Sequence, residues 1–140
     1  VEHGLLISVA SIPGIAVLKL FAWVDRGQED PKDAIDLVAL LRQYNEAGNQ
    51  ERVYEDAIAA LEAVGYDVEL AGAWLLGHDA AAMSSTATRS QLNLLFAEPT
   101  LVERLITDMS RAMRARDDAL DYSRNLLEQF LEGFAQKSLT

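Results

Sequence analysis

The sequence predicts a mainly all-α protein: a helical bundle of six to seven helices after a short N-terminal strand or extended segment. Apolar residues recur at three- and four-residue spacing through most of the chain, which is the period of a half-buried helix. Ser, Asp, Pro and Gly stand between these stretches, where helices start and stop. Residues 5–13 alone have the β-branched, apolar run of a strand. We expect a single helical domain over 1–140, with a strand and helix hairpin in 1–48 and a C-terminal bundle in 49–140.

Composition limits the function classes open to the chain. Its 140 residues predict one domain, and 50% of them are hydrophobic, as in globular proteins. No apolar run approaches the roughly 18 residues of a membrane span. The N-terminus lacks the basic start of a signal peptide, so a cytoplasmic location is expected. The absence of cysteine excludes disulfides, thiolate metal sites and cysteine catalysis. A net charge of −10 argues against direct nucleic-acid binding and leaves a basic partner open.

The first two predicted helices form a hairpin. Ser11 is placed to cap a helix over 13–25, and Gly27 follows as its stop. Asp30 is placed to cap the second helix, with Pro31 at its first position. The apolar face of that second helix contains Ala34, Leu37, Val38, Leu41 and Tyr44. The short turn between the two helices predicts antiparallel packing.

The middle of the chain predicts two more helices. One spans about 50–64 and ends at Gly65. Asp67 is placed to cap the next, over 68–83, which is rich in Ala and Gly. Small side chains of this kind allow another helix to approach closely. The polar stretch 84–90 then interrupts the helical pattern.

The remaining segments are also helical. A short helix is expected at 91–96, and Thr100 is placed to cap the next one. The apolar stripe of that helix contains Val102, Leu105, Ile106, Met109 and Met113. The last helix spans about 116–136. One side of it carries Leu120, Leu127, Leu131 and Phe134.

A lysine stands in the middle of the apolar stretch IAVLKLFAWVDRG at 15–27, and a buried charge needs a partner. Lys19 and Arg26 are seven residues apart, so they share one face of the first helix. Asp33 and Asp36 lie three apart near the start of the second helix, and antiparallel packing brings them toward those cations. Two interpretations stay open. One is a salt-bridged helix hairpin; the other is an anion site with a lysine for phosphate and an aspartate as general base.

The ordered motifs IPG, LKLFAW, DR, KDAIDL and LLRQY, all within 8–44, resemble the region after the catalytic strands in nucleotidyltransferase-like proteins. These proteins form the polymerase-β-type superfamily, which includes abortive-infection toxins of toxin–antitoxin pairs. The resemblance implies that Lys19 contacts the nucleotide and that Arg26 supports the site. It also implies that Asp33 or Asp36 is the late catalytic acid, and both stay candidates.

The metal-binding part of that superfamily's site is missing from this sequence. The resemblance requires a Gly-Ser turn and an Asp-x-Asp pair that holds divalent metal, and no Asp-x-Asp occurs. The nearest acids, Asp67 and Glu69, fit a helix cap and its first turn. We therefore expect the catalytic sheet to lie before Val1, so that the chain is a C-terminal fragment or a relative without that half. It would bind no metal and be inactive alone. Mg and a nucleoside triphosphate are expected for the complete family enzyme.

A non-enzymatic helical interaction module is the alternative function, with dimerisation through the C-terminal helices. The expected partners are a second copy, an N-terminal catalytic domain or an antitoxin, without a membrane. Other conspicuous residues have structural interpretations. His78 fits a polar helix position, and Trp23 and Trp74 fit core aromatics. The stretch RAMRARDDALDYSR fits a solvated helix face that pairs its own charges, with Arg114 and Asp118 four apart.

Overall fold

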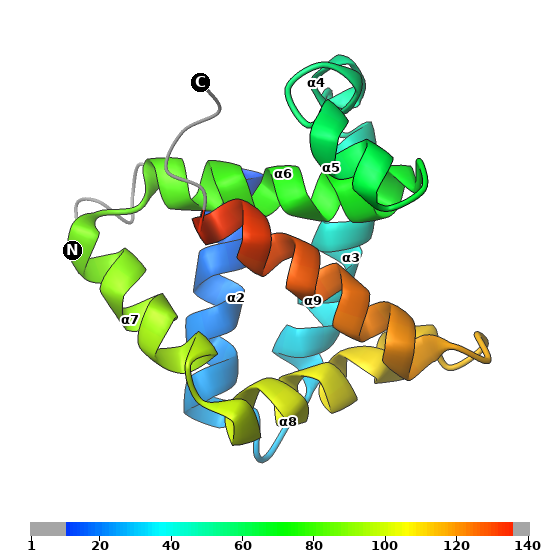
Figure 1. The fold of residues 1–140 in the computed structure, drawn as a ribbon. Coiled ribbons are helices and arrows are strands. Elements are labelled where there is room, and N and C mark those ends of the chain that lie inside the picture. The colour runs from blue at the N-terminus through cyan, green and yellow to red at the C-terminus, as the bar shows by residue number, and fades with distance from the viewer. Residues whose placement is uncertain (1–10, 136–140) are drawn as a thin grey trace.

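The computed structural model describes residues 11–135, and every regular element in that range is helical (Figure 1). Eight α-helices and two short 3-10 helices occur there, which confirms the predicted all-α class. The strand or extended segment predicted over 5–13 lies mostly outside the described residues. Its last two positions, Ile12 and Pro13, belong to the first helix instead.

Two antiparallel helices, α2 (Ile12–Arg26) and α3 (Lys32–Gln43), form the predicted hairpin. The Ser11 side chain caps α2 by accepting a hydrogen bond from the Gly14 N–H at 3.1 Å. At the second helix, the Asp30 carboxylate accepts from the Lys32 N–H at 3.0 Å. Helix α3 therefore begins one residue later than expected.

Helix α6 (Val68–Met83) is the central element of the fold, and its predicted cap is confirmed. The Asp67 carboxylate accepts a hydrogen bond from the Leu70 N–H at 3.1 Å. Residues on all sides of this helix are buried, as expected for a helix surrounded by others. They are Leu70, Ala71, Gly72, Ala73, Trp74, Leu75, Leu76, Gly77, Ala80 and Ala81.

Helix α9 (Ala119–Ala135) packs along α6 with the two backbones in contact. A Cβ placed on Gly77 would lie 2.0 Å from the Phe130 carbonyl oxygen. A Cβ on Gly133 would lie 1.9 Å from the Trp74 carbonyl oxygen. Only glycine fits at these two positions, so the close approach expected from the small residues of α6 is confirmed.

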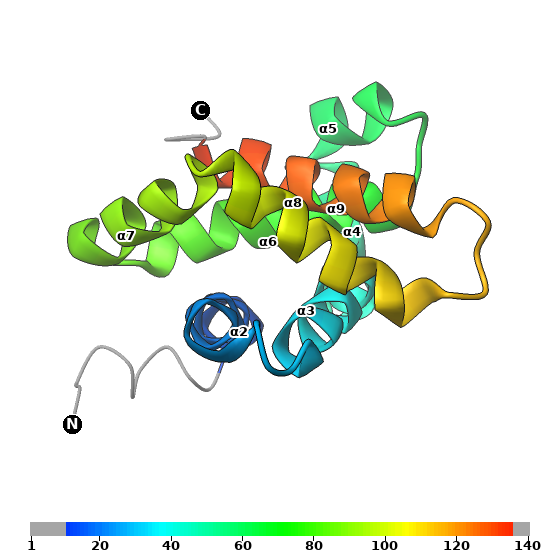
Figure 2. The same cartoon turned by 90° about the horizontal axis from the view of Figure 1, so that it is seen from below.

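Two layers result from these pairings. Figure 2 shows α2 and α3 side by side in one layer, with α6 and α9 in the other. Helix α8 (Pro99–Ser110) contacts both α9 and α3, so it joins the two layers at one end. Helix α7 (Thr86–Phe96) lies at the margin of the molecule and buries only Leu92 and Leu95.

The prediction of one continuous helix over 50–64 is wrong. A 3-10 turn (Tyr44–Glu46) leads into two short helices, α4 (Gln50–Tyr54) and α5 (Ile58–Ala63). At the break, the Ala57 N–H donates to the Arg52 carbonyl at 3.0 Å, five residues back instead of four. Asp has low helix propensity and lies in the break, at position 56. In addition, the Arg52 side chain forms a salt bridge with Asp79 on α6. The helical period of the sequence does not reveal this tertiary contact.

Three boundaries in the C-terminal half also differ from the expectation. Helix α7 begins at Thr86, not at 91, because Ser85 caps it by accepting from the Thr88 N–H at 3.1 Å. Helix α8 begins at Pro99, with no cap by Thr100, since proline suits a first helical position. Helix α9 begins at Ala119, three residues later than expected.

Most of the predicted core positions of α8 and α9 are buried, namely Leu105, Ile106, Met109, Met113, Leu127 and Phe134. Val102 and Leu131 are partly buried and pack against the core. Leu120 is exposed, which contradicts its predicted place on the apolar side. It lies in the first turn of α9, where the chain has only just entered the helix.

Candidate functional site

The α2–α3 hairpin brings together the four charged residues predicted for a site. The Lys19 Nζ donates to the Asp36 carboxylate at 2.7 Å and lies 3.6 Å from an Asp33 oxygen. Arg26 donates to both oxygens of Asp33, from Nε at 2.9 Å and from Nη2 at 3.3 Å. The seven-residue spacing on α2 and the three-residue spacing on α3 therefore produce one continuous charge network.

Burial separates the two aspartates. The Asp33 side chain is 1% exposed, whereas Asp36 is 38% exposed. Lys19 is 27% exposed, and Arg26, at 60%, covers Asp33 from the solvent side. Asp33 is thus a buried carboxylate held by two cations, and Asp36 is an accessible one held by a single lysine.

The electrostatics keep both cations charged. The hydrogen bond to Asp36 is the main cause that raises the pKa of Lys19, with a smaller contribution from Asp33. The hydrogen bond to Asp33 likewise raises the pKa of Arg26. A lysine with a raised pKa does not act as a base near neutral pH. Its chemical capability is to hold an anion.

A hollow continues the same face of the hairpin toward its open end. It has a volume of about 220 Å³ and is lined by Ile12, Leu40, Gln43, Tyr44, Glu46 and Ala47. Ile12 precedes Lys19 by two helical turns, and Leu40 follows Asp36 by one turn. The charged pair therefore lies one to two helical turns from a recess with a mixed apolar and polar lining.

Behind this face, α2 is fixed to α8 by a buried contact that sequence reasoning missed. The Trp23 indole N–H donates to the Asp108 carboxylate at 2.9 Å, and both residues are buried. The Arg104 guanidinium lies over the indole ring at 4.8 Å from its centre. Trp23 is a core aromatic, as expected, but with a polar anchor. Gly27 packs on the same indole, since a Cβ there would lie 2.5 Å from its nitrogen.

The acidic pair Asp67 and Glu69 has a structural place. The Tyr122 hydroxyl donates to Asp67 at 2.9 Å and contacts Glu69 at 3.2 Å, and Arg42 donates to Glu69 at 2.9 Å. These bonds join α3, α6 and α9. In residues 11–135, no group of three or more His, Asp or Glu side chains is arranged to hold a metal ion.

A second network that the sequence did not reveal surrounds Asp79 on α6. Arg52 donates to both Asp79 oxygens, at 2.8 and 2.7 Å, and the Tyr44 hydroxyl donates to the same carboxylate. Asn49 accepts from Arg52 at 2.9 Å. Beside this network, His78 is half-buried and stacks on the Trp74 ring at 5.4 Å between ring centres. These contacts fix the segment before α5 against α6.

The basic and acidic stretch at 111–124 does not form one self-paired helix face, because α9 begins only at Ala119. Arg116 donates to Asp118 at 2.7 Å in the loop and covers the Tyr122 ring. Arg124 reaches Glu103 on α8 through two bonds of 2.6 and 2.8 Å. The predicted pairing of Arg114 with Asp118 on one helix face is wrong, because both residues precede α9.

A family model described as the nucleotidyl transferase AbiEii toxin of the type IV toxin–antitoxin system matches residues 2–137. No curated protein and no solved structure matches the chain significantly. Among residues 11–135, no helix has the length and apolarity that a membrane crossing needs. The match spans nearly the whole sequence and includes the hairpin, so the chain belongs to the AbiEii family of nucleotidyl transferase toxins.

Proposed function

We propose that the α2–α3 hairpin forms one wall of a nucleotide site in a nucleotidyltransferase. The observation that carries this proposal is the Lys19 ammonium, fixed 2.7 Å from a carboxylate yet still accessible to solvent. An ammonium held in this way is a ready point charge for a phosphate group. Membership of a nucleotidyl transferase family supports the same conclusion.

We assign different roles to the two aspartates on the basis of burial. Asp36 is accessible, so it is the acid that can contact a substrate hydroxyl or act as a general base. Asp33 is enclosed by Lys19 and Arg26, so it is a positioning residue that sets the direction of both cations. Arg26 supports the site from its solvent edge.

The metal chemistry of this proposal needs groups that residues 11–135 do not assemble. The chemistry that Mg would supply, when bound, is positive charge to offset the phosphates of a nucleoside triphosphate. The hairpin offers the lysine and the acid but no cluster of metal ligands. We therefore propose that this chain alone binds nucleotide weakly and transfers none, and that its carboxylate partners come from a catalytic domain. This proposal includes a cytoplasmic location, where nucleoside triphosphates are available.

Calorimetric titration with ATP, GTP, CTP and UTP in Mg buffer tests the nucleotide wall. We expect Lys19→Ala to weaken the strongest signal by at least about tenfold, or 1.4 kcal/mol. Lys32→Ala is the matched control, because Lys32 is an exposed lysine at the start of the adjacent helix. Equal effects of the two substitutions, or no binding of any triphosphate to the parent protein, would contradict the proposal.

Asp36→Asn separates two roles of the exposed acid. If Asp36 contacts the sugar or base, the variant binds the nucleotide more weakly than the parent while inorganic triphosphate binding is kept. If it only neutralises Lys19, both ligands bind the variant more tightly, since the lysine is then free for phosphate. The second result would remove Asp36 from the site.

A partner protein is the second functional expectation, because the family description places the chain in a toxin–antitoxin system. An antitoxin partner is therefore implied. Self-association through α9 is a proposal that rests on the exposed Leu120 at its start. Light scattering over a range of concentrations tests it, with Leu120→Ser expected to abolish any rise in mass.

A further inference from the structure

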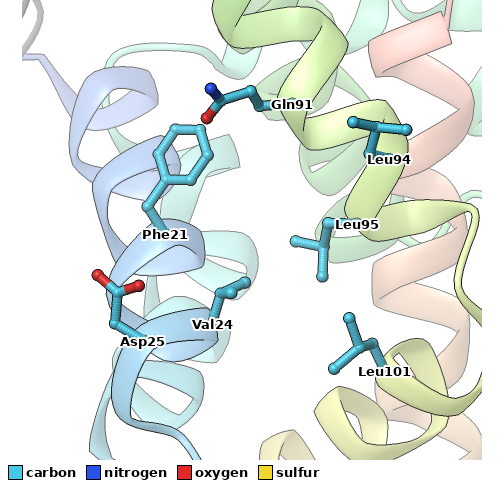
Figure 3. A pocket seen from close by; sticks show the side chains of 7 residues that line it. All are labelled: Phe21, Val24, Asp25, Gln91, Leu94, Leu95 and Leu101. Carbon is cyan, nitrogen blue, oxygen red and sulfur yellow. The ribbon is translucent and has the colours of Figure 1, made fainter.

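An open apolar groove separates α2 from α7, on the side of α2 away from the charged network. Figure 3 shows its lining residues, with α2 on one wall and α7 and the start of α8 on the other. It has a volume of about 640 Å³ and is lined by Phe21, Val24, Asp25, Gln91, Leu94, Leu95 and Leu101.

The groove leaves large apolar side chains in contact with water. Leu94 is 72% exposed and Val24 is 43% exposed, on opposite walls. Contiguous apolar surface of this kind is favourable to cover, at roughly 25 cal/mol per Å² of apolar area removed from water. Because five of the seven lining residues are apolar, aliphatic side chains suit the groove better than a polar small molecule does.

Charge identifies the kind of partner. Asp25 is the one charged residue in the lining, and it is exposed. It forms no salt bridge with any residue in 11–135, although its field reaches Arg26. A second copy of a chain with a net charge of −10 would bring further negative charge to this edge. A lysine or arginine beside the apolar anchors would instead complement the groove.

We propose that this groove binds an amphipathic helix of a different protein, with leucine-type anchors toward Val24 and Leu94 and a basic residue toward Asp25. Grooves walled by helices commonly accept a helix in this way, with anchors at three- and four-residue spacing. The site is distinct from the nucleotide wall, because Lys19 faces α3 whereas Phe21 and Asp25 face the groove. The two ligands can therefore be bound together.

Fluorescence anisotropy with two synthetic peptides tests this proposal. Both are amphipathic helices of roughly 18 residues, or five turns. They have the same leucine face, and the polar face is lysine in one and glutamate in the other. We expect the Leu/Lys peptide to bind the parent protein and the Leu/Glu peptide to bind at least about tenfold more weakly.

Two pairs of variants distinguish the groove from general attraction. Leu94→Glu should abolish binding of the Leu/Lys peptide, whereas Ile58→Glu, at an exposed aliphatic residue of α5 outside the groove, should not. Asp25→Lys should reverse the peptide preference, whereas Glu62→Lys makes the same charge change on α5 and should keep it. Equal effects within either pair would overturn the proposal.

Other occupants give other results. If Leu94→Glu converts a dimer of the parent protein into a monomer, a second copy occupies the groove and the proposed partner is wrong. If Leu5→Ser and Leu6→Ser together strengthen peptide binding, a segment of this chain competes for the groove. That result would also overturn the assignment to a different protein.

Discussion

The α6–α9 contact and the α2–α3 hairpin hold their helices together in opposite ways. At the first, Gly77 and Gly133 let the two backbones meet, and nearly every surrounding side chain is buried. At the second, four charged residues bridge the helices, and three of them remain accessible to solvent. The first contact tolerates no added atom. The second is held by ion pairs that are partly exposed, and pairs of this kind contribute little to stability, so changing one partner there should cost little.

The largest effect is expected from adding one methyl group to the close contact. Gly77→Ala places a Cβ on the Phe130 carbonyl, and Gly133→Ala places one on the Trp74 carbonyl. Because backbone must move to admit it, we expect either variant to lower the free energy of unfolding by about 3 kcal/mol. Urea unfolding measures the loss. Gly48→Ala is the control, since it has a φ of +78° and open space, and should cost about 1 kcal/mol from backbone strain alone.

The next effect separates the two aspartates of the hairpin. Asp33→Ala removes a buried carboxylate that accepts three charged contacts, so we expect a loss of about 2 kcal/mol. Asp36→Ala removes an accessible acid and should cost less than about 1 kcal/mol. Both values come from denaturant midpoints at neutral pH. Equal losses would contradict the assignment of Asp33 as the positioning residue.

The dependence of stability on alkaline pH tests the hydrogen bonds that Tyr44 and Tyr122 donate to carboxylates on and beside α6. Burial, then hydrogen bonds to Asp79 and Asp67, raise the pKa of Tyr44 and of Tyr122 in the folded state. The unfolded chain loses these protons near pH 10, whereas the folded chain retains them. The stability that these groups contribute is therefore complete below about pH 10 and is lost as the pH rises toward the folded-state values.

Tyr→Phe variants test this expectation, because each removes only the hydroxyl group. Tyr122→Phe should cost about 1 kcal/mol at neutral pH and flatten the decline in stability above pH 10. Tyr54→Phe and Tyr66→Phe make the same substitution at exposed tyrosines and serve as controls for the change itself. Chemical denaturation at a series of pH values measures the slope.

The smallest effect on stability is expected at the proposed ligand contact. Lys19→Met removes a partly exposed ion pair, and Asp33 stays paired with Arg26, so the loss should stay under about 1 kcal/mol. The same variant should lose nucleotide binding. A large loss of stability would mean that Lys19 is a structural residue and would weaken the proposed site.

Local signals predicted much of this structure. The caps Ser11 and Asp67 were found because a cap and its N–H lie within three residues of each other. The pairing of Lys19 with Asp36 was found because a short turn fixes how α2 and α3 meet. Contacts between residues that are close in the sequence can therefore be predicted from it.

Contacts between distant segments were missed. Asp108 lies 85 residues from its partner Trp23, and nothing near either residue indicates the bond. The groove was missed because residues 84–90 look polar, so the start of α7 and the wall that it builds were not expected. The break between α4 and α5 likewise depends on Arg52 reaching Asp79.

The two tryptophans lie in the two regions compared above. Trp74 lies in the α6–α9 contact and stacks on His78, whereas Trp23 lies in the hairpin beneath Arg104. Each indole therefore has a different charged or aromatic neighbour and a different position relative to the proposed sites. Single-tryptophan variants would give the protein an internal pair of fluorophores, one that reports on loss of the core and one that reports on what happens at the hairpin.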